Sequence, residues 1–178
     1  MPSNSQPRYA IATVTAVGKD LALTLREKLG KEIPIYTTPR LADDRVIAIE
    51  GRVVEALGQL FQEVDVLICI MAIGAVVRAI APVLKDKATD PAVVVMDEKA
   101  TNVISLLSGH LGGANQVTLD IAELLGSNPV ITTATDVQNV TALDNLAQSV
   151  NGWRLELREF IKPFNSYLGS GRTVYFYQ

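Results

Sequence analysis

Strand-like and helix-like segments alternate along most of this chain, and this alternation limits the possible folds more than any other feature. Apolar, β-branched runs are separated by segments whose apolar residues recur at helical spacing. Such an order predicts a three-layer α/β/α sandwich with a mostly parallel, Rossmann-like sheet and right-handed crossovers. The predicted strands are 9–15, 33–37, 46–49, 66–71, 92–96, 103–107 and 130–133, and the predicted helices are 18–29, 52–61, 75–81, 112–125 and 143–150.

One pair of predicted strands is joined by a polar turn instead of a helix. The segment 97–102 connects the two strands, so this pair can be antiparallel. We expect residues 1–150 to form an α/β amino-terminal domain and residues 151–178 to form a tail or linker. The apolar strand at 174–177 either pairs back into the sheet or leads toward a domain absent from this chain.

Composition excludes several classes of function. With 178 residues, 48% of them hydrophobic, the chain can bury a core, and a net charge of −3 with 6% aromatic residues argues against nucleic-acid binding. Residues 1–8 lack the apolar core of a signal peptide and no apolar run is long enough to span a membrane, so we expect a cytoplasmic protein. The lone cysteine, Cys69, is expected to be buried, and one cysteine with one histidine predicts no metal site built of those ligands.

The only histidine of the chain lies in a glycine-rich stretch, residues 108–115, between a predicted strand and a predicted helix. This position places His110 near a helix start, where backbone N–H groups attract anions. An imidazole can act as a general acid or base near neutral pH. A structural histidine that donates to a backbone carbonyl is the other interpretation, and the sequence leaves both open.

Three polar or glycine-containing loops follow the ends of predicted strands. They are 72–75, with Arg78 just beyond, then 108–115 and 133–136. Ligands of open parallel sheets bind at the edge where the strands end, so neighbouring strands would bring these loops into one crevice. The segment 133–136 is explained equally well as a strand end followed by a helix cap.

The side chains and amides of these loops indicate how such a crevice would work. Asp136 is the nearest carboxylate that can orient His110, and the amides of Gly112 and Gly113 can bind a carboxylate or an oxyanion. Three cations can bind the carboxylates of a polyanionic ligand, although a solvated basic surface explains them as well: Arg78, Lys85 and Lys87.

Four blocks of sequence occur in a specific order: 71–78, 85–95, 104–115 and 129–136. In sequence, order and spacing they resemble the signature blocks of the CbiG family of cobalamin biosynthesis, the cobalt-precorrin-5A hydrolases of the anaerobic pathway. The resemblance covers about residues 9–150 and concerns the amino-terminal region of that family.

The resemblance implies a hydrolase that opens the lactone of cobalt-precorrin-5A and releases acetaldehyde to give cobalt-precorrin-5B. We assign proton transfer to His110 and its orientation to Asp136. No cofactor is expected, since cobalt arrives inside the cobalt-corrinoid substrate, and the other expected partners are enzymes of the pathway or the family's carboxyl-terminal domain. The residues expected to bind substrate are Gly74, Arg78, Lys85, Lys87, Ser108, Gly109, Gly112, Gly113, Asn115, Thr133 and Thr135.

Two other functions stay open on the sequence. The first is a non-catalytic tetrapyrrole-binding module whose chemistry needs a carboxyl-terminal domain or a partner enzyme. The second is a generic nucleotide- or phosphate-binding domain. The turn 15–19 lacks the dinucleotide glycine pattern and no segment matches a phosphate loop, which argues against tight binding of NAD or ATP.

Overall fold

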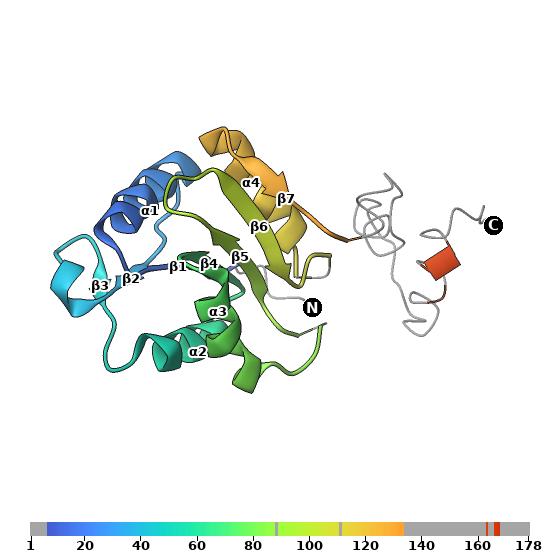
Figure 1. Ribbon diagram of the computed structural model, residues 1–178, viewed down its shortest axis with the longest axis horizontal. Helices are drawn as coiled ribbons and strands as arrows, with labels where there is room; N and C mark the ends of the chain where they lie inside the picture. Colours follow the sequence, from blue (N-terminus) through green and yellow to red (C-terminus); the bar gives the residue numbers. More distant parts are fainter. Residues whose placement is uncertain (1–6, 88, 111, 134–162, 164–165, 168–178) are drawn as a thin grey trace. The chain divides into compact units, whose positions relative to one another are not determined.

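The computed structural model describes residues 7–87, 89–110, 112–133, 163 and 166–167. Within them, seven strands form one sheet in the order β3-β2-β1-β4-β5-β6-β7 (Figure 1). The strands are β1 (Tyr9–Thr13), β2 (Ile35–Thr37), β3 (Ile47–Ala48), β4 (Val66–Ile70), β5 (Ala92–Met96), β6 (Asn102–Leu107) and β7 (Asn128–Val130). The helices are α1 (Ala16–Leu29), α2 (Val53–Glu63), α3 (Ile73–Ile80) and α4 (Ala114–Leu125), with short 3₁₀ helices at Pro39–Leu41 and Ala81–Val83.

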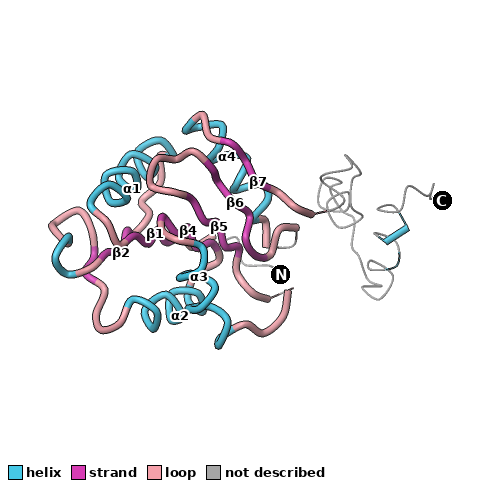
Figure 2. The backbone as a smooth tube through the Cα atoms, in the orientation of Figure 1, coloured by secondary structure: helices cyan, strands magenta, loops and turns pink. Residues whose placement is uncertain are grey.

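The helices cover both faces of the sheet, which confirms the predicted three-layer α/β/α sandwich (Figures 1 and 2). Helices α1 and α4 pack on one face, where Leu25 and Ile121 are fully buried among the strand residues. Helices α2 and α3 pack on the other, where Leu57 and Val76 are fully buried. Burial of these apolar faces is the main force that holds the layers together.

Strand direction divides the sheet into two groups. Strands β1 to β5 are mutually parallel, whereas β6 runs antiparallel to β5 with Val93 opposite Leu107 and Met96 opposite Val103. The antiparallel pair expected from the turn 97–102 is therefore confirmed. We call the edge where β1, β4 and β5 begin the amino edge, and the edge where they end the carboxyl edge. Because β7 is parallel to β6, both of these strands end at the amino edge.

The last described strand differs from the prediction in its position. The sequence predicted a strand at 130–133, but β7 spans Asn128–Val130 and pairs Pro129 with Val103. Proline has no amide to donate, and β7 tolerates it because β7 is the end strand of the described sheet.

Cys69 lies fully buried in β4, as expected, and is a free cysteine. Burial raises the pKa of its thiol to about 12. A thiol that stays protonated inside the core is not a nucleophile at neutral pH, so Cys69 serves packing.

The chain divides into two compact units, Met1–Val130 and Ile131–Gln178, and the sheet described above belongs to the first. The predicted boundary at residue 150, the helix at 143–150 and the strand at 174–177 lie outside the described residues and stay predictions. In the part of the chain that the structure describes, no helix has the length and apolarity needed to cross a membrane.

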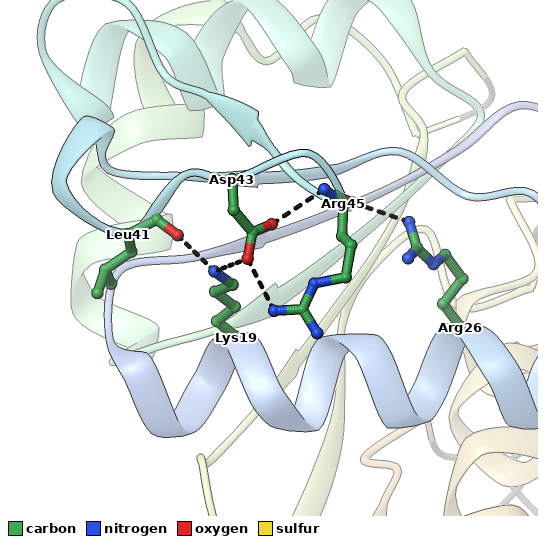
Figure 3. Close-up of polar contacts among 5 residues, drawn as sticks. All are labelled: Lys19, Arg26, Leu41, Asp43 and Arg45. Carbon is green, nitrogen blue, oxygen red and sulfur yellow. Dashed lines mark hydrogen bonds and ion pairs between the residues drawn. The ribbon is translucent and has the colours of Figure 1, made fainter.

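Hydrogen bonds among Lys19, Arg26, Leu41, Asp43 and Arg45 join the connection between β2 and β3 to helix α1 (Figure 3). The ammonium of Lys19 donates to the carbonyl of Leu41 at 2.6 Å and to Asp43 at 2.7 Å. The guanidinium of Arg45 also donates to Asp43, at 2.7 Å, while Arg26 donates to the carbonyl of Arg45 at 3.1 Å. Hydrogen bonds from Arg45 and Lys19 hold the pKa of the Asp43 carboxyl well below its usual range.

Replacing Asp43 with asparagine is expected to lower the melting temperature at neutral pH by a few degrees. Because the pKa of Asp43 is lowered on folding, its contribution is complete above the pKa of the unfolded chain and disappears as the pH falls through the folded value. The difference between wild type and Asp43→Asn should therefore shrink below about pH 4. Melting curves against pH test this, with the exposed neighbour Asp44→Asn as control, and a difference that grows in acid contradicts it.

Candidate active site

Residues 108–113, between β6 and α4, carry His110, and we call them the histidine loop. Because β6 runs against β5, this loop lies at the amino edge, beside the point where β5 begins. The hydroxyl of Ser108 donates to the carbonyl of Asp90 at 2.9 Å, and His110 itself is half-buried. Ser108 has a φ of +57°, in the left-handed region that serine rarely adopts. Tertiary contacts therefore hold the loop in a conformation that its own residues do not favour.

The histidine loop caps helix α4 with its own carbonyl groups. The amide of Ala114 donates to the carbonyl of Ser108 at 3.1 Å, and the amide of Asn115 donates to the carbonyl of Gly109 at 3.0 Å. These are two of the helix-start amides that the sequence led us to expect as anion donors. They are already satisfied inside the loop.

Two glycines shape the turn after His110. Gly113 has a φ of +83°, and its amide donates to the carbonyl of His110 at 3.0 Å. This bond corrects the oxyanion-binding role predicted for the Gly113 amide. Gly112 allows a close approach, since a Cβ there would lie 2.5 Å from the Cβ of Ser108 and 2.9 Å from its carbonyl oxygen. The amide of Gly112 has no backbone acceptor among the described residues, and its oxyanion-binding role stays a prediction.

Asn115 supports the histidine loop from within the fold. Its side chain is almost fully buried, and the hydroxyl of Ser105 donates to Oδ1 at 2.6 Å. A Cβ at Gly109 would lie 2.6 Å from the same oxygen, so the loop backbone packs directly on this side-chain amide. Asn115 and Gly109 thus set how closely the histidine loop packs against the start of α4.

Residues 84–90, which we call the lysine loop, are joined to the histidine loop at the amino edge. The carboxylate of Asp90 accepts from the backbone N–H of Lys85 at 3.1 and 3.2 Å, and the carbonyl of Asp90 accepts from Ser108. Lys85 and Lys87 are exposed. The structure therefore places these two cations on the same edge as His110.

A cleft of about 170 Å³ opens at the amino edge beside the lysine loop and is lined by residues that include Arg8, Asp65, Lys85 and Asp90. The guanidinium of Arg8 pairs with Asp65 at 3.1 Å and its backbone N–H donates to the same carboxylate at 2.8 Å. These hydrogen bonds lower the pKa of Asp65. Arg8 and Val64 also line a neighbouring cleft of about 590 Å³. The two clefts, the lysine loop and the histidine loop thus all lie at the amino edge of the sheet.

Gly74 and Arg78 lie at the carboxyl edge, and this corrects the prediction that their loop shares a crevice with the histidine loop. Helix α3 begins where β4 ends, and β4 runs opposite to β6. The guanidinium Nη1 of Arg78 donates to the carbonyl of Gly74 at 3.0 Å, so it folds back toward the start of α3. The two loops lie on opposite edges of the sheet.

Three predicted site residues remain: Thr133, Thr135 and Asp136. Thr133 is half-buried and belongs to the second compact unit, while Thr135 and Asp136 lie outside the described residues. The substrate-binding role of the threonines and the orienting role of Asp136 stay predictions.

Asp90 is the site residue that reasoning from the sequence missed. It is 9% exposed, although charged residues are seldom buried without a reason. A signal was present: Asp90 and Pro91 stand directly before the apolar run of β5, and a carboxylate at the start of a buried strand needs a backbone donor. No group of three or more histidine, cysteine, aspartate or glutamate residues in the described ranges is arranged to hold a metal ion.

Known proteins resemble this chain in sequence and in fold. Residues 55–136 match the family described as "Cobalamin synthesis G N-terminal". The chain is 43% identical over 154 residues to a cobalt-precorrin-5A hydrolase of Salmonella typhimurium and 39% identical over 170 residues to one of Priestia megaterium. These matches cover 85% and 93% of this chain but 44% and 45% of the relatives, so the chain spans less than half of their length.

A solved structure shares the fold. The crystal structure of a cobalamin biosynthesis protein G homologue from Sulfolobus solfataricus matches with a TM-score of 0.55 at 23% identity. The match covers 96% of this chain and 51% of that chain. At this identity the likeness supports the fold, and the site rests on the residues of this chain.

Replacing Gly112 with alanine is expected to displace the histidine loop and to cost about 1–3 kcal/mol of stability, because the added Cβ overlaps Ser108. Since His110 is the only histidine, its imidazole proton signals report the displacement directly by NMR. Gly30→Ala is the matched control: φ there is +60° but no atom lies within 4 Å of the added Cβ. It should destabilise the chain without moving the His110 signals, and unchanged signals in Gly112→Ala would contradict the close packing.

Proposed function

Because this chain belongs to the CbiG family of cobalamin synthesis, we propose that its amino edge contributes the active site of a cobalt-precorrin-5A hydrolase. One observation carries the proposal: the hydrogen bond from Ser108 to Asp90 joins the loop that bears the only histidine to the loop that bears Lys85 and Lys87. A proton-transfer group and two cations thus lie along one edge. That combination suits a hydrolysis on a substrate that carries many carboxylates.

In the proposed reaction, His110 takes a proton from water as the water oxygen attacks the lactone carbonyl. The amide of Gly112 stabilises the oxyanion that forms. Collapse of this intermediate breaks the carbon–oxygen bond and leaves a carboxylic acid and an alkoxide. The alkoxide becomes the carbonyl of acetaldehyde as the carbon–carbon bond to the macrocycle breaks, and the electron pair of that bond stays on the macrocycle. The macrocycle then takes the proton that His110 holds, which regenerates the neutral imidazole, and the carboxylic acid loses its proton to solvent.

Lys85 and Lys87 have a binding role in this proposal. Both are exposed, and their ammonium groups can meet carboxylates at the rim of the macrocycle. The whole chain is acidic, so this local pair of cations matters for guiding an anionic substrate to the right edge. Cobalt is part of the substrate here, and we propose no cofactor of the protein's own.

A second candidate is a tetrapyrrole-binding module without activity of its own, because the cleft at the amino edge and the exposed Lys85 and Lys87 need no proton transfer to bind an anionic macrocycle. The two candidates are separated by incubating the purified chain with cobalt-precorrin-5A and measuring bound corrinoid and released acetaldehyde. Acetaldehyde release supports the hydrolase. Binding without release supports the module, and the absence of both contradicts the two candidates together.

His110→Ala is expected to lower kcat by at least about 10²-fold, because it removes the proton-transfer group. Substrate binding should change little, since Lys85 and Lys87 remain in place. His110→Gln is a control that keeps hydrogen-bonding capacity without proton transfer, and it should be equally slow. A His110→Ala protein with full turnover rejects the assignment.

The double variant Lys85→Ala, Lys87→Ala is expected to raise KM by about 3- to 10-fold at low salt, with kcat nearly unchanged, because exposed cations attract but are screened. Arg78→Ala should change KM by less than about 2-fold, since its guanidinium lies at the carboxyl edge. Steady-state kinetics at two ionic strengths test both. A large effect of Arg78→Ala with none from the lysines would place the substrate at the other edge.

A further inference from the structure

We propose that Asp90 is a positioning residue that sets the lysine loop against the histidine loop. The effect of Asp90 on catalysis rests on the proposed function, whereas its hydrogen bonds to the two loops are a property of the fold. Asp90 is not among the residues that the sequence led us to expect in the site.

Asp90 reaches both loops with different groups. Its carboxylate accepts from the amide of Lys85, at 3.1 and 3.2 Å, and its own amide donates to the carbonyl of Asp86 at 2.8 Å. Its carbonyl accepts from the hydroxyl of Ser108 at 2.9 Å. The side chain thus closes the lysine loop, and the main chain of the same residue receives the histidine loop.

The energetic cost of this arrangement points to a role beyond closing a loop. Among the described residues Asp90 is the charged residue that falls in the buried class, and a carboxylate in such a position needs hydrogen-bond donors to replace its hydration. Ser108, at the other end of the link, has a left-handed φ of +57°. The hydrogen bond thus joins a buried aspartate to a serine with an unfavourable backbone conformation, and such conformations are common where geometry serves a site.

A second aspartate at the carboxyl edge provides the contrast. Asp97 also closes a turn through backbone amides, accepting from Lys99, Thr101 and Asn102 at 3.0, 3.2 and 2.8 Å. It is exposed, and its turn lies at the edge opposite the histidine loop. Closing a turn in this fold does not need a buried carboxylate, and Asp97 is a matched control for Asp90.

The test uses four variants of the full chain. Asp90→Ala removes the acceptor for Lys85, and Ser108→Ala removes the donor to Asp90. Asp90→Asn keeps a side-chain oxygen acceptor without the charge, so it should rescue the position. Asp97→Ala is the control at the other edge.

Three readouts are combined: the NMR signals of His110, amide hydrogen exchange in residues 108–113, and kcat with KM for acetaldehyde release. Asp90→Ala and Ser108→Ala should move the His110 signals, speed exchange in the histidine loop by about 10-fold or more, and lower kcat by about 10- to 10²-fold with a smaller change in KM. Asp90→Asn and Asp97→Ala should leave the His110 signals and the exchange rates close to wild type.

Two outcomes overturn the proposal. In the first, Ser108→Ala, which removes a single hydroxyl, leaves the His110 signals and exchange unchanged; this holds even if Asp90→Ala fails to fold. In the second, Asp90→Asn loses activity while the His110 signals stay in place, which would make the carboxylate act on its own. If the wild-type chain releases no acetaldehyde, the proposed function fails, while the NMR and exchange measurements still decide the positioning role.

Discussion

The antiparallel pairing of β6 with β5 is the constraint on which the candidate site depends. A parallel crossover needs a dozen or more residues, and the turn 97–102 is too short for one. The reversal is held by the pairing of the two strands, with Val93 opposite Leu107 and Met96 opposite Val103. Once the chain has reversed here, β6 ends beside the start of β5, where the lysine loop also arrives from α3. A tight turn at one edge therefore brings two loops together at the other.

Because β6 is reversed, helices α1 and α4 begin at opposite edges of the sheet. Helix α1 begins at the carboxyl edge, where ligands of parallel sheets are usually bound, but its cap is closed because Thr15 Oγ1 accepts from the amide of Gly18 at 3.0 Å. Helix α4 follows the reversed strand β6 and so begins at the amino edge. The glycine-rich helix start of this chain thus lies on the side that the general rule for parallel sheets does not indicate.

The elements were predictable because they depend on local patterns, and their relative placement was not. The apolar run of β4 and the short turn 97–102 were readable in the sequence, and both expectations are confirmed. The grouping of Arg78 with His110 was wrong because it counted every strand end as lying at one edge, although one strand runs backwards. The bond between Ser108 and Asp90 joins residues 18 positions apart and needs a left-handed serine, which no local pattern predicts.

The way α4 begins limits which groups can stabilise charge beside His110. At a free helix start, several amides and the helix dipole act together on an anion. Here the carbonyls of Ser108 and Gly109 accept from the first amides of α4, and their partial negative charge offsets the dipole. In the proposed reaction, stabilisation of an oxyanion therefore falls to the amide of Gly112 and to the exposed cations of the lysine loop. The Gly112 amide has a direction fixed by the backbone, so we expect it to select the geometry of the reacting carbonyl. We expect the lysines, whose charges salt screens, to contribute attraction at a distance.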